Sequence, residues 1–403
     1  MEFREDVGGF LPRITNHDCR AIEQALAGPS LFDPGLRLEG AVVEASFAAR
    51  EHPLLDRLRE AGTPYLVDPQ TIRFATETYL SVEALAKLAY APTSPLAPES
   101  LDASARRAFV REVLLFQQKA GASAYMVPAL PAMAAGPPVA LNLAFLGDAT
   151  DLNGSFVELK PLVAMLVPGR TVMASADQLI KPLADLPLEA AYIQPIRLHP
   201  TRDGIEQLVK YVTFLLAVAD LGLPVVAGRV GAFGLVLAAM GVGFFDSGLG
   251  DAESFDLGQL NRPRKRNPNS KFGGGRNRRI YLEALKTTLI QKHASAVLDE
   301  DTGLRSRFVC DLRCCRFKGF EGLADRRREH YLHVRSSEVA RLRAEPTASM
   351  KLHRIHEHLV EAREHAEVVQ RVLKSRGVEA PRFDHLDRWL GCLARIAGIS
   401  TAA

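Results

Sequence analysis

Two aspartates directly follow apolar runs that are typical of buried strands. Asp246 ends the run Val242–Phe245, and Asp68 ends the run TPYLV, residues Thr63–Val67. An ionised carboxylate is costly to bury unless it has a partner or a chemical task. Parallel barrels and doubly wound sheets carry their chemistry at the carboxyl ends of their strands. We interpret Asp68 and Asp246 as candidate catalytic residues; the alternative for each is a salt bridge or a cap on the next turn.

Two further strand ends carry groups suited to binding a base or a phosphate. His199 follows the expected strand Ala191–Leu198, and Arg229 lies in the glycine-bearing turn after Leu223–Ala227. Ends of parallel strands share one face of a barrel, so these side chains become candidates for substrate binding. A structural salt bridge or cap is again the alternative for both.

Three cysteines crowd into six residues and precede a histidine-rich stretch. Cys310, Cys314 and Cys315 are followed by four candidate fourth ligands: His330, His333, His353 and His356. Three thiolates and one imidazole make a closed, structural zinc site. The alternative is two buried thiols and one surface thiol, and the spacing alone leaves the histidine open.

Positive charge is concentrated in one part of a chain whose net charge is only +3. Residues 261–343 hold 21 Lys or Arg against 9 Asp or Glu, so the remainder is acidic. Within this block, Asn261–Arg279 is rich in Pro, Asn, Gly and Arg, which predicts a long mobile loop. Arg264, Lys265 and Arg266 are its candidate contacts to a nucleic-acid backbone. A solvated arm without a partner is the alternative.

Alternating strand and helix patterns connect these groups and predict a (β/α)8 barrel with a C-terminal zinc-binding and helical extension. The expected domain limits are 1–260 for the barrel body, 261–279 for the basic loop, and 280–403 for barrel closure and the Cys/His and helical part. Pro161–Val167 is apolar but ambiguous, and Ile280–Leu298 is expected to be helical because Leu282, Leu285 and Leu289 share one face. The other expected strands are Gly40–Phe47, Ala124–Val127 and Arg170–Ser175, and the expected helices are Glu51–Ala61, Ala105–Ala120, Gly204–Ala219 and Ala232–Met240.

The composition excludes several classes of protein. With 403 residues, 47% of them hydrophobic and 24% charged, the chain is of ordinary globular type. Its N-terminus lacks the pattern of a signal peptide, and no run of about 18 apolar residues predicts a membrane span. Five cysteines, three of them clustered, do not suit a secreted disulfide framework. We expect a cytoplasmic protein that does not engage a membrane.

Four segments between Val42 and Leu373 resemble the tRNA-guanine transglycosylase family, zinc-bearing barrel enzymes that exchange a guanine base in nucleic acid. They are GTPYLVDPQTIRF, VVAGRVGAFGLVLAAMGVGFFDSG, the basic loop after it, and CDLRCC followed by HYLHVRSSEV and LHRIHEHL. By this resemblance Asp246 matches the nucleophile and Asp68 the acid or base of the pocket. It also implies Zn2+ held by Cys310, Cys314, Cys315 and His353.

The implied reaction is base exchange, in which Asp246 attacks the anomeric carbon of a guanosine unit and Asp68 serves the leaving and incoming bases. The implied partners are tRNA or DNA and a purine-type base, and whether the protein forms a homodimer is left open. Two alternatives remain. One is a non-catalytic nucleic-acid-binding paralogue of this fold, favoured by altered pocket segments. The other is an unrelated barrel enzyme acting on a small metabolite.

Overall fold

The computed structural model describes residues 9–27, 38–50, 52–156, 158–250, 255, 278–298, 302–309 and 319–398. Eight short parallel strands form its centre. They are β1 (Gly9–Ile14), β2 (Ala41–Glu44), β3 (Tyr65–Asp68), β4 (Tyr125–Met126), β5 (Leu162–Leu166), β6 (Ala190–Ile193), β7 (Val225–Ala227) and β8 (Phe244–Gly248).

The sheet closes on itself. Its strand order is β3-β2-β1-β8-β7-β6-β5-β4, and a parallel bridge between Leu66 and Ala124 joins the two remaining edges. The first and last strands pair in register from Gly9 opposite Phe244 to Arg13 opposite Gly248. The chain is therefore a (β/α)8 barrel, and the fold predicted from the sequence is confirmed.

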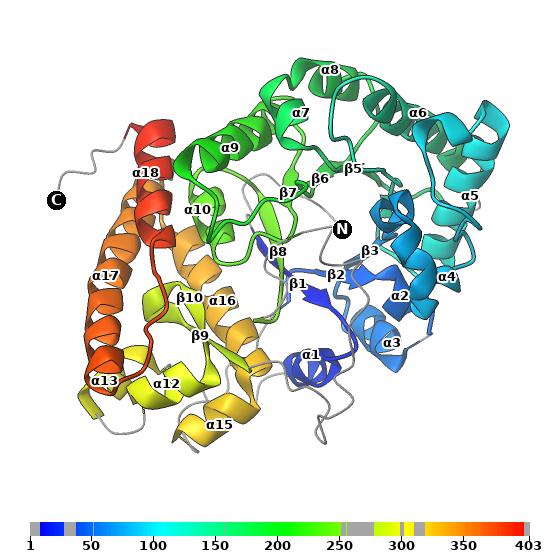
Figure 1. The fold of residues 1–403 in the computed structure, drawn as a ribbon. Coiled ribbons are helices and arrows are strands. Elements are labelled where there is room, and N and C mark those ends of the chain that lie inside the picture. Colours follow the sequence, from blue (N-terminus) through cyan, green and yellow to red (C-terminus); the bar gives the residue numbers. More distant parts are fainter. Residues whose placement is uncertain are drawn as a thin grey trace.

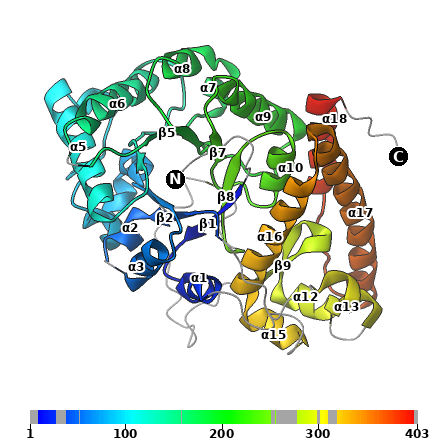
Figure 2. The ribbon, with the colours of Figure 1, turned by 180° about the vertical axis from the view of Figure 1, so that it is seen from behind.

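Helices surround this barrel, as the two opposite views in Figures 1 and 2 show. Those that precede β8 are α1 (Cys19–Leu26), α2 (Ala45–Ala48), α3 (Pro53–Glu60), α4 (Glu83–Ala86), α5 (Ala103–Lys119), α6 (Pro137–Asn153), α7 (Arg170–Ala174), α8 (Asp177–Ile180), α9 (Ile205–Ala219) and α10 (Phe233–Ala239). Single 3-10 turns connect some of them: η1 (Thr71–Ala75), η2 (Glu77–Ser81), η3 (Pro98–Ser100) and η4 (Lys181–Leu183).

Alternation along the strands divides the core into two layers. Val43 and Val67 face outward into the large core beneath the helices, whereas Val42 and Leu66 belong to the smaller core inside the barrel. Because side chains alternate with a period of two, the inner face continues toward the strand ends. There it presents polar residues instead of apolar ones: Arg13, Glu44, Asp68, Tyr192, Gln194 and Asp246.

The chain after the barrel forms a hairpin and a helical layer on one side. The hairpin is β9 (Arg279–Leu282), η5 (Glu283–Leu285) and β10 (Thr287–Ile290). The helices are α12 (Gln291–Leu298), α13 (Thr302–Phe308), α15 (Gly319–Asp325), α16 (Arg327–Ala344), α17 (Ala348–Ser375) and α18 (His385–Ala397). Helix α16 packs against β1 and α1, while α18 packs against α9 and α17. None of the helices in the described residues is long and apolar enough to cross a membrane.

A buried ionic cluster joins this layer to the barrel. Lys286 Nζ donates to Glu338 Oε1 at 2.6 Å, and Arg335 Nη1 donates to Glu338 Oε2 at 3.1 Å. Burial alone would raise the pKa of Glu338, but the charges of Lys286 and Arg335 outweigh it and lower that pKa. Arg335 Nη2 also donates to the Tyr331 hydroxyl at 3.4 Å, and this hydroxyl lies 3.0 Å from that of Ser247 on β8, so the cluster reaches the barrel.

Two segments were assigned to the wrong kind of element, and the expected strand Gly40–Phe47 ends early, at Glu44, because helix α2 begins at Ala45. Arg170–Ser175 was expected to be a strand, but Arg170–Ala174 is helix α7, which packs against α9. Ile280–Leu298 was expected to be one helix, yet it begins with the β9–β10 hairpin. Its turn residue Lys286 has a φ of 49°, a conformation that interrupts a right-handed helix. The ambiguous Pro161–Val167 contains β5, whose five residues are all buried.

Candidate active site at the barrel mouth

Both candidate catalytic aspartates lie inside the barrel at the carboxyl ends of its strands. Asp68 is the last residue of β3, and Asp246 is the third residue of β8. They are 1% and 0% exposed. The strand alternation places both on the inner face, because Leu66 and Phe244, two positions before each, belong to the inner core.

A buried arginine from β1 joins the two carboxylates. Arg13 is 0% exposed, and its Nη1 donates to Asp68 Oδ2 at 2.6 Å. Its Nε lies 2.8 Å from Asp246 Oδ2, and its Nη2 lies 2.6 Å from the same oxygen. The two carboxylates are thus separated by little more than the width of one guanidinium group, so both lie at the same mouth of the barrel.

Further donors hold these carboxylates. The Tyr192 hydroxyl donates to Asp246 Oδ2 at 3.1 Å, and the backbone N–H of Arg229 donates to Asp246 Oδ1. The backbone N–H of Gln70 donates to Asp68 Oδ1 at 2.8 Å. Burial alone would raise the pKa of Asp68, but the charges of Arg13 and Arg229 outweigh it and lower the pKa below its usual value. Asp68 is therefore a carboxylate at neutral pH.

Arg229 forms a second ion pair beside the first. Its Nη2 donates to Glu44 Oε1 at 2.8 Å, and Glu44 is paired in register with Asp68 on the neighbouring strand. Its guanidinium also lies over the ring of Phe255, with Cζ 5.8 Å from the ring centroid. Phe255 is buried and bridges to Leu198. This aromatic ring thereby covers part of the mouth.

Two buried donors at this mouth have no hydrogen-bond acceptor among the residues that the structure describes. They are Gln194 Nε2 and Arg229 Nε, on side chains that are 0% and 4% exposed. A buried donor without an acceptor costs roughly 1–3 kcal/mol. Donors of this kind suit a ligand that brings carbonyl, ring-nitrogen or phosphate acceptors into the site.

One of the other predicted site residues, His199, does not lie at the end of a barrel strand. Strand β6 ends at Ile193, so the residue at its carboxyl end is Gln194 and not His199. The backbone N–H of His199 donates to Asp203 Oδ2 at 3.0 Å, near the start of α9. The basic residues Arg264, Lys265 and Arg266 and the cysteines Cys310, Cys314 and Cys315 lie outside the described residues.

Two of the four histidines considered for zinc differ in their exposure. His353 is on α17 with 73% of its side chain exposed, and its Nε2 lies 3.2 Å from Glu357 Oε1. His330 is 1% exposed, and its Nε2 lies 2.9 Å from the carbonyl oxygen of Tyr281. His353 is consequently the more accessible of these two candidate ligands. Within the described residues, no three His, Cys, Asp or Glu side chains are grouped so as to hold a metal ion.

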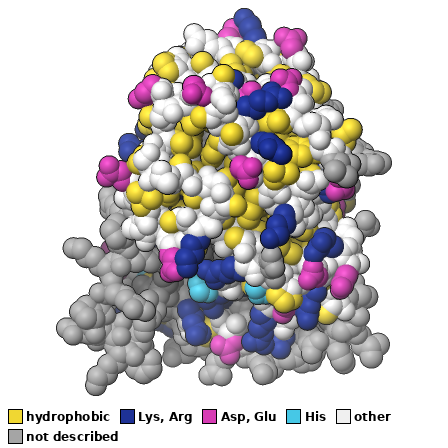
Figure 3. All heavy atoms as spheres, turned by 90° about the vertical axis from the view of Figure 1, so that its right-hand side faces the viewer, with side chains coloured by type: hydrophobic (Ala, Val, Ile, Leu, Met, Phe, Trp, Pro, Cys, Tyr) yellow, Lys and Arg dark blue, Asp and Glu magenta, His cyan; other side chains and the backbone are white. Residues whose placement is uncertain are grey.

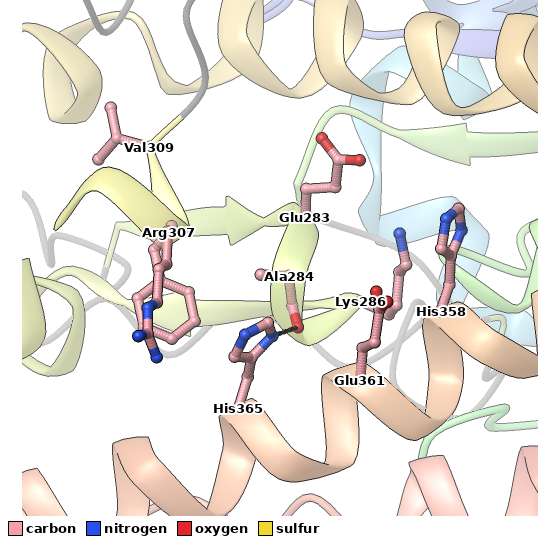
Figure 4. Close-up of a pocket in the computed structure, with 9 residues that line it drawn as sticks. Glu283, Ala284, Lys286, Arg307, Val309, His358, Glu361 and His365 are labelled. Atoms are coloured by element: carbon pink, nitrogen blue, oxygen red, sulfur yellow. Dashed lines mark hydrogen bonds between the residues drawn. The ribbon is translucent and has the colours of Figure 1, made fainter. Parts of the chain in front are cut away.

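A cavity of about 270 Å³ lies between α17, η5 and the end of α13. Figure 4 shows His358, Glu361 and His365 projecting from α17 toward Glu283 and Lys286. Burial lowers the pKa of His358 to about 4, so this imidazole is neutral at pH 7. Val309, the residue before Cys310 in the sequence, also lines this cavity.

A second, larger cavity lies on the outside of the barrel, between α3 and α5. Its volume is about 630 Å³, and Arg59, Lys87 and Lys119 line it together with Asp56 and Glu112. Figure 3 shows the side of the molecule on which α5 lies, where basic side chains are most frequent in the lower half. Both acidic and basic side chains line this cavity. It therefore lacks the uniformly positive charge that would favour binding of a polyanion.

Sequence reasoning missed Arg13, Tyr192 and Gln194. Arg13 was missed because β1, with sequence GFLPRI, contains a proline and a charge and does not read as a buried strand. The period of two was the available signal, since Leu11 and Arg13 share the inner face. Tyr192 and Gln194 were inside an expected strand whose end was placed too late.

Comparison with known proteins leaves the family open. No family model and no curated protein matches the chain. Among solved structures, xylanase B from Clostridium stercorarium F9 is similar to it, with 9% identity over 61% of this chain and 87% of that chain. Its TM-score of 0.35 carries no argument about function.

Proposed function

We propose that the protein is a base-exchange enzyme of the tRNA-guanine transglycosylase type, acting on guanine in tRNA or DNA. One observation carries the proposal: the two aspartates that the resemblance assigns to the chemistry lie in one buried mouth, on opposite sides of one guanidinium. Chemistry at the carboxyl ends of barrel strands is the rule for this fold.

The reaction follows retaining carboxylate chemistry. An oxygen of Asp246 attacks the anomeric carbon, the bond from that carbon to the base breaks, and its electron pair leaves with the base. The incoming base, which loses the proton of its attacking ring nitrogen to water, then displaces Asp246 and restores the glycosidic bond, while the departed base takes up a proton from water. Gln194 Nε2 and Arg229 Nε, which have no acceptor within the described part of the chain, would bind acceptor atoms of the base or the adjoining phosphate.

Zinc and the basic loop complete the proposal. Cys310, Cys314, Cys315 and His353 provide the donor chemistry of a closed zinc site, and the exposed imidazole of His353 is compatible with that role. Such a zinc ion would stabilise the fold around the cysteines without entering the reaction. Arg264, Lys265 and Arg266 would bind phosphates of the nucleic acid.

Base exchange is tested by incubating the purified protein with radiolabelled guanine and either tRNA or duplex DNA. Asp246→Asn should lower incorporation by at least about 10³-fold, as loss of a catalytic nucleophile does. Asp148→Asn is the matched control, because Asp148 pairs with Arg106 at 2.6 Å on the outer helices. Incorporation that is absent in wild type, or unchanged in Asp246→Asn, would refute the proposal.

A second candidate is a nucleic-acid-binding paralogue that has lost the reaction. The observation favouring it is that both carboxylates are buried and already paired with Arg13. This second candidate requires that the protein bind tRNA or DNA in a salt-dependent manner and incorporate no guanine. The same two substrates therefore decide between the candidates.

A further inference from the structure

We propose that Arg13 stabilises the negative charge that develops on the departing base, a role that rests on the proposed base exchange. Arg13 contacts both candidate catalytic carboxylates directly. It would act on the reaction through its charge in a site that excludes water, where such interactions are strongest.

Asp68 is held in its ionised form. A carboxylate must carry a proton in order to donate one, yet the charges of Arg13 and Arg229 lower the pKa of Asp68 despite its burial. Both Asp68 oxygens also accept hydrogen bonds, from Arg13 Nη1 and from the Gln70 backbone N–H. In this arrangement Asp68 is not the proton donor, and the leaving base departs as an anion.

The negative charge in the mouth moves from Asp246 to the base during the reaction. Before the reaction, one guanidinium is shared by two carboxylates. When Asp246 forms the bond to the anomeric carbon it becomes a neutral ester, and the negative charge passes to the base with the electron pair. Ionised Asp68 and the base anion then occupy the same buried mouth, and like charges so close in a dry site are strongly unfavourable. Arg13 is the cation already in contact with Asp68 and with the oxygen that loses its charge.

The strands hold Arg13 rigidly in place. The residue is 0% exposed, and its Nη2 also donates to the Tyr192 hydroxyl at 2.5 Å. Its backbone is paired with Val42 on β2 and with Gly248 on β8. A charge fixed in advance needs no reorganisation as the reaction proceeds, which is the condition for electrostatic catalysis.

The experiment compares two leaving groups in wild type and in Arg13→Lys. Lysine keeps the charge but lacks the planar fork that contacts two carboxylates at once. Nucleic acid carrying guanine is compared with the same nucleic acid carrying 8-azaguanine, whose extra ring nitrogen makes its anion more stable. Release of guanine should fall by about 10²-fold, the usual cost of losing one oxyanion donor, and release of 8-azaguanine should fall much less.

A second variant and a pH profile distinguish the proposed role of Arg13 from loss of folding and from a merely structural role. In Arg13→Gln, Asp68 regains the ability to take a proton, so activity should recover as the pH is lowered from 8 to 6, unlike in wild type. Thermal unfolding verifies that each variant is folded. Arg106→Lys, which alters the outer Arg106–Asp148 pair, is the control and should leave both releases unchanged.

The outcomes separate the two proposals. No base exchange by the wild-type protein on tRNA or DNA refutes the proposed function itself. Exchange by wild type with equal losses for both bases in Arg13→Lys, or with faster exchange in that variant, refutes only the role of Arg13. A larger loss for guanine, with recovery of Arg13→Gln at low pH, supports it.

Discussion

The Tyr192 hydroxyl and Arg13 Nη2 lie 2.5 Å apart, although β7 and β8 separate their strands in the sheet. The contact therefore crosses the interior of the barrel. The same hydroxyl donates to Asp246 Oδ2 at 3.1 Å. Burial raises the pKa of Tyr192 well above its usual value, so this phenol stays protonated and remains a donor.

Gly228→Ala should displace Tyr192 from this position. A Cβ on Gly228 would lie 2.4 Å from the Tyr192 hydroxyl oxygen, and overpacking of this kind costs about 1–3 kcal/mol. Denaturant unfolding measures the loss. The control is Gly147→Ala on α6, where the added Cβ meets nothing within 4 Å and should stabilise the helix by about 0.5–1 kcal/mol. Equal stability of the two variants would contradict this packing.

The contribution of His385 to the stability of the protein should fall as the pH falls from 7 to 5. Burial lowers the pKa of His385, on α18, to about 4 from 6.5. The unfolded chain then binds a proton that the folded chain does not, so this contribution is complete above pH 6.5 and is lost toward pH 4. The loss between pH 7 and 5 is about 2 kcal/mol.

His385→Phe tests this contribution, because phenylalanine preserves a ring next to Trp389, 4.9 Å away between centroids. The difference in unfolding free energy between pH 7 and pH 5 should be about 2 kcal/mol smaller in the variant. Urea unfolding at the two pH values measures it. An unchanged pH dependence would mean that His385 takes up its proton over the same pH range in the folded and the unfolded protein.

How far the sequence predicted the site depends on how each group is positioned. Asp68 and Asp246 were found because an acidic residue after an apolar run is visible in one dimension. Arg13 is buried only because two carboxylates, 55 and 233 residues away, neutralise it. No local pattern indicates that a charged residue has such distant partners.

The same reasoning explains the two errors in the fold. Leu282, Leu285 and Leu289 have a helical spacing, but Leu282 and Leu289 also fit the hairpin, where Leu282 pairs with Thr287 and Leu289 with Ile280. Periodicity in a short segment does not decide between these structures. Arg170–Ser175 contains the β-branched residues Thr171 and Val172, which favour a strand. The position beside β5 in the sheet is nevertheless taken by Ala190–Ile193, and the segment from Arg170 to Ala174 is helical.

The basic loop should account for much of the salt dependence of nucleic-acid binding. Replacing Arg264, Lys265 and Arg266 by alanine removes three cations, and each lost phosphate contact lowers the slope of log K against log salt by roughly one unit. Fluorescence anisotropy with tRNA and duplex DNA between 50 and 200 mM salt, about the range in which such contacts dominate, measures the slope. The control replaces Lys87, Lys119 and Arg59 of the outer cavity. A slope that is unchanged in the loop variant refutes phosphate binding by the loop.

Zinc content tests the proposed Cys/His site. Protein purified without chelator should contain about one zinc per chain, and removal of the metal should increase proteolysis after Cys310 while the barrel stays folded. Cys314→Ser and His353→Gln should each lower the zinc content. Folded protein without metal would exclude the site, whereas zinc retained by His353→Gln would point to another histidine, such as His356.

Closure of the barrel through β1 and β8 has a consequence for synthesis of the protein on the ribosome. Arg13 and Asp246 are 233 residues apart in the chain, which at about 5–20 residues per second corresponds to tens of seconds of translation. Throughout that interval, β1 lacks the neighbour that completes its hydrogen bonding, and its arginine lacks one of its two counter-ions. The N-terminal strand is thus an unpaired edge that a chaperone or an aggregating chain can bind, until the last strand leaves the ribosomal tunnel.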